Sequence, residues 1–200
     1  AVERTQELLC VIGECFRNGR IPSMPVYLDS PLAIDATEVF RRRRDEYDEA
    51  AIEMVRNGID PFSFPELVLS RTTEESIAIN QKTGAAIVIA GSGMCTAGRI
   101  KHHLKHNLWR PGASLVIVGF QAAGTLGRSI VDGQRAVKIY GEKIMVRAKV
   151  FTIGGFSAHA DQSLLLNWVS HFENPKLRVH VIHGEPRSSE AFAALVKDRL

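Results

Sequence analysis

Residues 151–161 read FTIGGFSAHAD, and this stretch decides how the C-terminal part of the chain is expected to fold. The apolar residues 150–153 predict a strand, which Gly154 and Gly155 end. Apolar residues close to helical spacing then predict a helix over 162–172. His159 is therefore expected in a strand-to-helix loop, where polar side chains can face a ligand and the helix N-terminus favours anions.

A second histidine stands in the same kind of position. The apolar residues 179–182 predict a strand that ends in His183-Gly184-Glu185, before a final helix over 188–200. One histidine after a strand is most often structural. Two histidines at the carboxyl ends of strands are well placed to share one crevice, so the pair is a candidate site.

The preceding part of the chain alternates strands with helices. Strands are expected over 25–28, 67–69, 85–90 and 115–120, and helices over 2–17, 32–43, 46–56, 72–81, 98–107 and 126–132. This alternation predicts an α/β fold with an open, mostly parallel sheet flanked by helices. The pattern changes after residue 133, where residues 136–146 predict a hairpin around Gly141-Glu142. We therefore expect two domains, residues 1–133 and 134–200.

Several other features have a plain structural interpretation. Asp29 ends a strand, but a structural role is favoured over that of a catalytic acid. The run Arg41–Arg44 is most simply a solvated helix face. His102 and His106 are four residues apart on one helix, but lysines beside them disfavour a metal site. The glycine loop at 91–93 can present backbone N–H groups to a phosphate, yet it matches no nucleotide-binding pattern.

Composition fits a soluble globular protein, with 45% hydrophobic and 24% charged residues, and a net charge of +3 permits nucleic-acid binding without requiring it. Cys10, Cys15 and Cys95 are odd in number and form no CxxC pair, which favours a reducing, cytoplasmic compartment. No apolar run reaches membrane-spanning length, so no membrane partner is expected. Both ends of the chain fall inside helical patterns, so we expect a fragment of a longer protein.

The residues GFSAHAD (155–161) and VIHGE (181–185) resemble the last two motifs of the β-CASP nucleases, a family of the metallo-β-lactamase superfamily that includes the endonuclease subunit of the mRNA cleavage and polyadenylation machinery. AGSGMCTAGR (90–99) and GFQAAGTL (119–126) also resemble that family, and the similarity covers nearly the whole chain. The resemblance implies a β-CASP domain over 1–133, followed by the C-terminal strands and helices of a metallo-β-lactamase αββα sandwich.

The resemblance also implies a chemistry, the zinc-dependent hydrolysis of RNA phosphodiesters in RNA processing or decay. It implies that His159 is the acid toward the leaving oxygen and that His183 gives one imidazole to a zinc ion. Asp161 and Glu185 are candidates for orienting these histidines, although either can simply cap a helix. Members of the family that act on RNA carry His in the last motif, where DNA-repair members carry Val, so His183 favours RNA.

RNA phosphates are expected to lie against the loop of Gly91, Ser92, Gly93 and Met94, with Arg99 and Arg128 neutralising their charge. The HxHxDH stretch that supplies most zinc ligands in the family is absent from the 200 residues.

A zinc site normally needs three or four ligands. We therefore expect two zinc ions in the full-length enzyme, none held firmly by this fragment, and no activity of the fragment alone. A non-catalytic RNA-binding or scaffold paralogue is the main alternative, and a hydrolase of small substrates is less favoured. Endonuclease or exonuclease action, the RNA target, and a homo-oligomer or other RNA-processing partners are left open.

Overall fold

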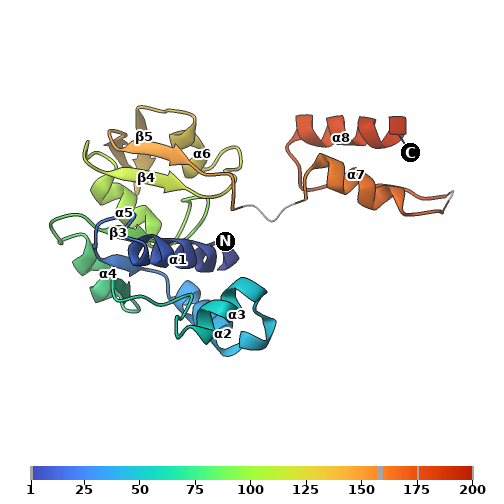
Figure 1. Ribbon diagram of the computed structural model, residues 1–200. Helices are drawn as coiled ribbons and strands as arrows, with labels where there is room; N and C mark the ends of the chain where they lie inside the picture. The colour runs from blue at the N-terminus through green and yellow to red at the C-terminus, as the bar shows by residue number, and fades with distance from the viewer. Residues whose placement is uncertain (1, 157–159, 175, 200) are drawn as a thin grey trace. The chain divides into compact units, whose positions relative to one another are not determined.

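The computed structural model describes residues 2–156, 160–174 and 176–199 (Figure 1). They divide into two compact units, residues 1–157 and residues 158–200. The first unit contains α1 (Val2–Arg17), β1 (Val26–Leu28), α2 (Pro31–Arg42), the 3-10 helix η1 (Arg44–Glu46), α3 (Glu49–Arg56), β2 (Leu67–Leu69), α4 (Thr73–Ile79), β3 (Ile87–Ile89), α5 (Ile100–Asn107), β4 (Ser114–Ile117), α6 (Leu126–Val131), β5 (Ala136–Ile139), β6 (Glu142–Met145) and β7 (Lys149–Thr152). The predicted mixed α/β fold with parallel strands and flanking helices is confirmed.

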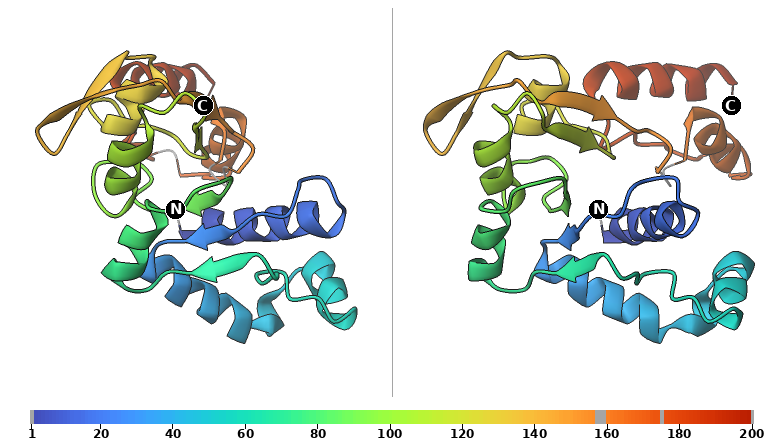
Figure 2. Two further views of the ribbon diagram at one scale, coloured as in Figure 1. Left: turned by 90° about the vertical axis from the view of Figure 1, so that its left-hand side faces the viewer. Right: turned by 60° about the vertical axis from the view of Figure 1, so that its left-hand side comes forward.

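A three-stranded parallel sheet in the order β2-β1-β3 forms the first half of this unit (Figure 2). Its helices begin where local sequence signals place them. The hydroxyl of Ser30 accepts a hydrogen bond from Ala33 N at 3.3 Å, and Pro31 occupies the first turn of α2, so the predicted cap is confirmed. Helices α1 and α2 pack against β1 through a buried apolar cluster of Leu9, Val26, Leu28, Ala33, Ile34 and Phe64.

A second parallel pair joins β4 to β7, with Ser114 opposite Lys149 and Ile117 opposite Thr152 (Figure 1). Its buried residues share one core with α5, α6 and the β5–β6 hairpin: Cys95, Leu104, Leu108, Ile117, Ile130, Val137 and Ile139. The strand predicted at 150–153 is therefore present, and its partner lies in the alternating part of the chain. The domain boundary expected near residue 133 stays a prediction.

The hairpin turn lies one residue earlier than predicted. Ile139 pairs with Glu142, which leaves Tyr140 and Gly141 as the two turn residues. Both have positive φ, 50° for Tyr140 and 83° for Gly141. A type I′ turn, whose twist matches the flanking strands, has positive φ at both positions, so the turn is centred on Tyr140-Gly141.

The second unit contains α7 (Gln162–Ser170) and α8 (Pro186–Arg199). The predicted strand over 179–182 is wrong, because these residues form no strand in the described chain. A strand is held by hydrogen bonds to a neighbouring strand, and residues 160–174 and 176–199 contain no other strand that could pair with it. Across the described ranges, no helix is both long enough and apolar enough to cross a membrane.

Candidate functional site

Polar residues follow the strands of the three-stranded sheet at the edge where those strands end. Asp29 follows β1, Ser70 follows β2, and Gly91 lies two residues after β3. In α/β proteins, ligands bind in the crevice outside the carboxyl ends of parallel strands. This edge is therefore the first candidate for a functional site in the first unit.

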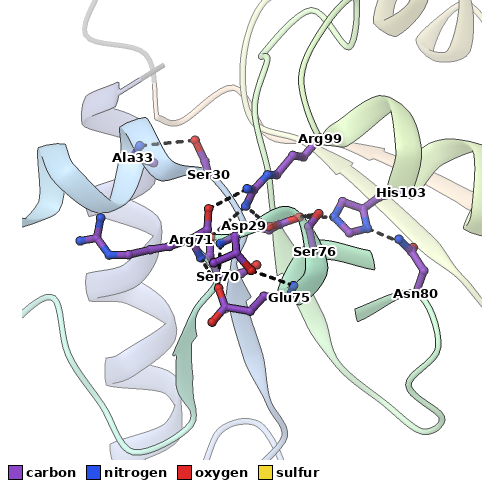
Figure 3. A network of polar contacts seen from close by, with 11 residues as sticks. Asp29, Ser30, Ala33, Ser70, Arg71, Glu75, Ser76, Asn80, Arg99 and His103 are labelled. Atoms are coloured by element: carbon purple, nitrogen blue, oxygen red, sulfur yellow. Dashed lines mark hydrogen bonds and ion pairs between the residues drawn. The ribbon is translucent and has the colours of Figure 1, made fainter. Parts of the chain in front are cut away.

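Asp29 is fully buried at this edge and remains a carboxylate (Figure 3). Its oxygens accept hydrogen bonds from Ser76 Oγ at 2.6 Å and Arg99 Nη1 at 2.7 Å, and one lies 2.6 Å from His103 Nε2. Burial alone would raise the pKa of Asp29, but hydrogen bonds from Ser76, His103 and Arg99 outweigh burial and lower it below the ordinary value. This is the structural role that the sequence favours.

His103 extends the network away from Asp29. Its Nδ1 lies 3.1 Å from Asn80 Oδ1, which also accepts a hydrogen bond from Asn107 Nδ2 at 3.2 Å. Because a carboxylate only accepts, Nε2 of His103 must carry a hydrogen toward Asp29. Both ring nitrogens are therefore engaged by neighbouring side chains, and His103 belongs to a buried hydrogen-bond network.

Arg99 ties three segments together from its position just before α5. Its Nη1 donates to Asp29 Oδ1 at 2.7 Å and to the Ser70 carbonyl oxygen at 2.9 Å, and its Nη2 donates to the Arg71 carbonyl oxygen at 2.8 Å (Figure 3). The sequence places Arg99 among the RNA-phosphate contacts and gives no sign of these acceptors. In the structure its guanidinium joins the ends of β1 and β2 to the start of α5.

The loop of Gly91, Ser92, Gly93 and Met94 is closed by its own hydrogen bonds. Ser92 N donates to the Ala97 carbonyl oxygen at 3.2 Å, and Cys95 N donates to the Ser92 carbonyl oxygen at 3.0 Å. Gly98 makes this closure possible. It has φ of 73°, and a Cβ built on it would lie 2.6 Å from the Gly91 carbonyl oxygen. The backbone of the candidate phosphate loop is therefore fixed before any ligand binds.

Replacing Gly98 by Ala is expected to lower the free energy of unfolding by about 1–3 kcal/mol, because alanine is strained at positive φ and its methyl group would clash with Gly91. Gly112→Ala is the matched control. A Cβ at Gly112 meets nothing within 4 Å, so that variant should be neutral or slightly stabilising. Urea unfolding of both variants measures the difference, and equal stability of the two would contradict the role given to Gly98.

The loop after β4 packs against the glycine loop. Gln121 is buried, and its Nε2 donates to the Gly93 carbonyl oxygen at 2.8 Å. Gly127 N donates to the Met94 carbonyl oxygen at 3.1 Å, which joins the start of α6 to the same loop. Arg128, the other predicted phosphate contact, donates from Nε to the Asp132 carboxylate at 2.8 Å. The two motif segments, 90–99 and 119–126, are thus held together by hydrogen bonds.

The guanidinium of Arg4, in α1, lies close to the end of β7. The sequence alone does not predict this contact. Its Nε donates to the Phe156 carbonyl oxygen at 3.1 Å, although 152 residues separate the two in the chain. Gly119 makes room for this side chain, since a Cβ there would lie 2.5 Å from Arg4 Nη1. No local pattern at residue 4 signals this placement, because it depends on how α1 packs.

The second unit holds the remaining candidates. Asp161 caps α7, accepting hydrogen bonds from Leu164 N at 2.8 Å and Ser163 Oγ at 2.7 Å, and the bond from Leu164 N lowers its pKa. His183 is exposed and has φ of 66°, and Glu185 directly precedes α8. His159 lies outside the described residues. The sequence also allows Asp161 to act as a helix cap, and its hydrogen bond from Leu164 N is such a cap.

The described residues do not form a complete metal centre. Over residues 2–156, 160–174 and 176–199, no three His, Cys, Asp or Glu side chains gather where they could hold one ion. An imidazole is a suitable zinc ligand, so His183 fits as one donor. A zinc ion needs three or four, so this part of the chain does not by itself make a zinc centre.

Two family models match the chain. The Beta-Casp domain matches residues 5–130, and the Zn-dependent metallo-hydrolase RNA specificity domain matches residues 143–200. The α/β unit with the motif loops therefore corresponds to a Beta-Casp domain, followed by a metallo-hydrolase RNA specificity domain. The chain belongs to the β-CASP family.

Three relatives illustrate the similarity. Ribonuclease TTHA0252 of Thermus thermophilus is 41% identical over 98% of this chain and 44% of its own length. The RNase J-like protein of Methanocaldococcus jannaschii is 33% identical over 98% of this chain and 44% of its own length. The transcription termination factor FttA of Pyrococcus horikoshii is 34% identical over 94% of this chain and 29% of its own length. The chain thus spans less than half the length of each.

Proposed function

We propose that this chain is part of a metal-dependent ribonuclease that hydrolyses RNA phosphodiester bonds in RNA processing or decay. The observation that carries the proposal is 41% identity, over 98% of the chain, to a protein named as a ribonuclease. The second family model adds support, since its description joins zinc-dependent hydrolysis to RNA specificity. His183, where DNA-repair members of the family carry Val, favours RNA over DNA.

The proposed roles divide between the two units. In the second, His183 would give one imidazole to a two-zinc centre whose other ligands lie outside these 200 residues, and His159 would protonate the leaving oxygen. Bound zinc would supply an activated water and charge stabilisation at the phosphate. Glu185 is a candidate for orienting a histidine, and Asp161 caps α7. In the first unit, Gly91, Ser92, Gly93 and Met94 contact RNA phosphates, with Arg99 and Arg128 adding positive charge.

The test uses the longer protein that contains this chain, loaded with zinc, and compares an end-labelled RNA with DNA of the same sequence. We expect cleavage of RNA, loss of cleavage after chelation, and little cleavage of DNA. The 200-residue chain alone should cleave neither. RNA binding without cleavage by the zinc-loaded protein would instead favour the non-catalytic RNA-binding or scaffold alternative.

A further inference from the structure

Positive charge is concentrated in one part of the chain. Residues 99–149 contain ten Lys and Arg against two Asp and Glu, whereas the other 149 residues contain fifteen against twenty. The segment thus carries a net charge of +8 and the rest carries −5, which together give the chain's +3. The segment includes α5 and the β5–β6 hairpin, which contact each other through Lys105 Nζ and Glu142 Oε1 at 2.6 Å. The chain's mild overall charge therefore combines a basic segment with an acidic remainder.

Two lysines face each other on the outer side of the hairpin. Lys138 of β5 is directly opposite Lys143 of β6, and both side chains are exposed. Within the described residues, neither lysine forms an ion pair. Like charges directly opposite in an antiparallel pair are destabilising. A bound polyanion would offset that repulsion, so this arrangement favours an anionic ligand.

An aromatic side chain stands at the turn beside these lysines. Tyr140 is 48% exposed, and its hydroxyl lies 3.0 Å from His102 Nε2. Lys101 Nζ lies 4.4 Å from the centre of the Tyr140 ring. The His102 ring also lies against the Tyr140 ring, with centroids 4.8 Å apart and planes 33° apart, so Lys101 and His102 hold the half-exposed ring at the start of α5. Exposed aromatic rings among cations are the usual means of binding single-stranded nucleic acid, because bases stack on them without regard to sequence.

We propose that α5 and the β5–β6 hairpin form a second RNA-binding surface, in addition to the Gly91–Gly98 loop. Lys101, Lys138 and Lys143 contact phosphates of a single strand, and Tyr140 offers a base the part of its ring that His102 and Lys101 leave exposed. The partner is RNA because the proposed function supplies RNA, and the inference rests on that function. An acidic protein is the other partner that a basic surface fits, and the test below separates the two.

The test measures RNA affinity against salt for the longer protein that contains this chain. The variant carries Lys101→Gln, Lys138→Gln and Lys143→Gln. The matched control carries Lys82→Gln, Lys176→Gln and Lys197→Gln, which remove the same charge from exposed lysines outside the basic segment. Each lost phosphate contact on a single strand changes the slope of log K against log salt by about 0.7.

We expect the first variant to have a slope shallower by about 2 and an affinity lower by on the order of 100-fold at 0.1 M salt, while the control changes far less. Equal changes in the two variants would overturn the inference. Displacement of bound RNA by polyglutamate as readily as by unlabelled RNA would also overturn it and would assign the surface to acidic proteins.

The proposal of a second RNA-binding surface and the proposal of ribonuclease activity can fail independently in these experiments. Normal cleavage by the wild-type protein, together with equal salt slopes for both variants, would contradict the second RNA-binding surface and leave the ribonuclease proposal intact. The expected difference in slope, without any cleavage by the zinc-loaded wild type, would support the surface and overturn the ribonuclease proposal. Tyr140→Ala removes the ring and should bind RNA more weakly than the wild type.

Discussion

Replacing Asp29 by Ala is expected to lower the free energy of unfolding by about 3–5 kcal/mol, the cost of leaving buried charged partners without their counterpart. The carboxylate is fully buried and joins Arg99, Ser76 and His103, so its loss removes one acceptor from three donors at once. Urea unfolding followed by far-ultraviolet circular dichroism measures the change.

Asp35→Ala is the matched control, since Asp35 also pairs with an arginine, Arg71, at 2.7 Å, but on the surface. An exposed pair of this kind is worth about 0–1 kcal/mol, so the control should be nearly neutral. A similar loss of unfolding free energy in both variants would show that burial of Asp29 does not increase its contribution to stability.

The same network predicts how stability depends on pH. The folded-state pKa of Asp29 is lowered, so its contribution is fully present above the unfolded-state pKa of about 3.9 and is lost as the pH falls through the folded-state pKa. Stability of the wild-type protein should therefore fall in that acid range. Asp29→Asn should flatten the fall, and an unchanged profile in that variant would place the acid sensitivity elsewhere.

The other large effect is expected for the two motif histidines in the longer, zinc-loaded protein. His159→Ala should reduce turnover by roughly 10²–10⁴, the loss of a general acid, while zinc content and RNA affinity stay close to wild type. His183→Ala should reduce both zinc content and turnover, because a ligand is removed. Elemental analysis and single-turnover cleavage measure the two quantities on the same samples.

His180→Ala is the control, because His180 is exposed and lies three residues before His183. It should retain zinc and turnover. Equal zinc loss in the His159 and His183 variants would make His159 a ligand, and normal turnover without His159 would remove it from the mechanism.

Features set by neighbouring residues could be predicted from the sequence. The cap of α2 at Ser30-Pro31 was predictable because its hydrogen bond spans three residues. The same holds for the capping box that opens α4, where Thr72 and Glu75 bond each other's backbone. The strands β1, β2 and β3 were predictable because short apolar runs bounded by turn residues are typical of strands in an α/β pattern.

Features set by distant residues could not be predicted. The ion pair of Arg99 with Asp29 is one example, because the two residues are 70 apart in the sequence and meet only once β1 and α5 are side by side. Residues 179–182 have the composition of a strand, yet composition does not supply a partner to pair with. The roles of His159, His183 and the glycine loop depend on ligands beyond this chain, so they stay predictions.

The pairing of β4 with β7 bears on how the chain can be shortened. A form that stops at residue 132 keeps β4 but loses the strand that satisfies one of its edges, together with Val137 and Ile139 of the shared core. The exposed edge of an apolar strand such as Ser114–Ile117 is a template for pairing with other copies of the chain. Shortened forms that end between β4 and β7 should therefore tend to aggregate, and forms that extend past residue 152 should not.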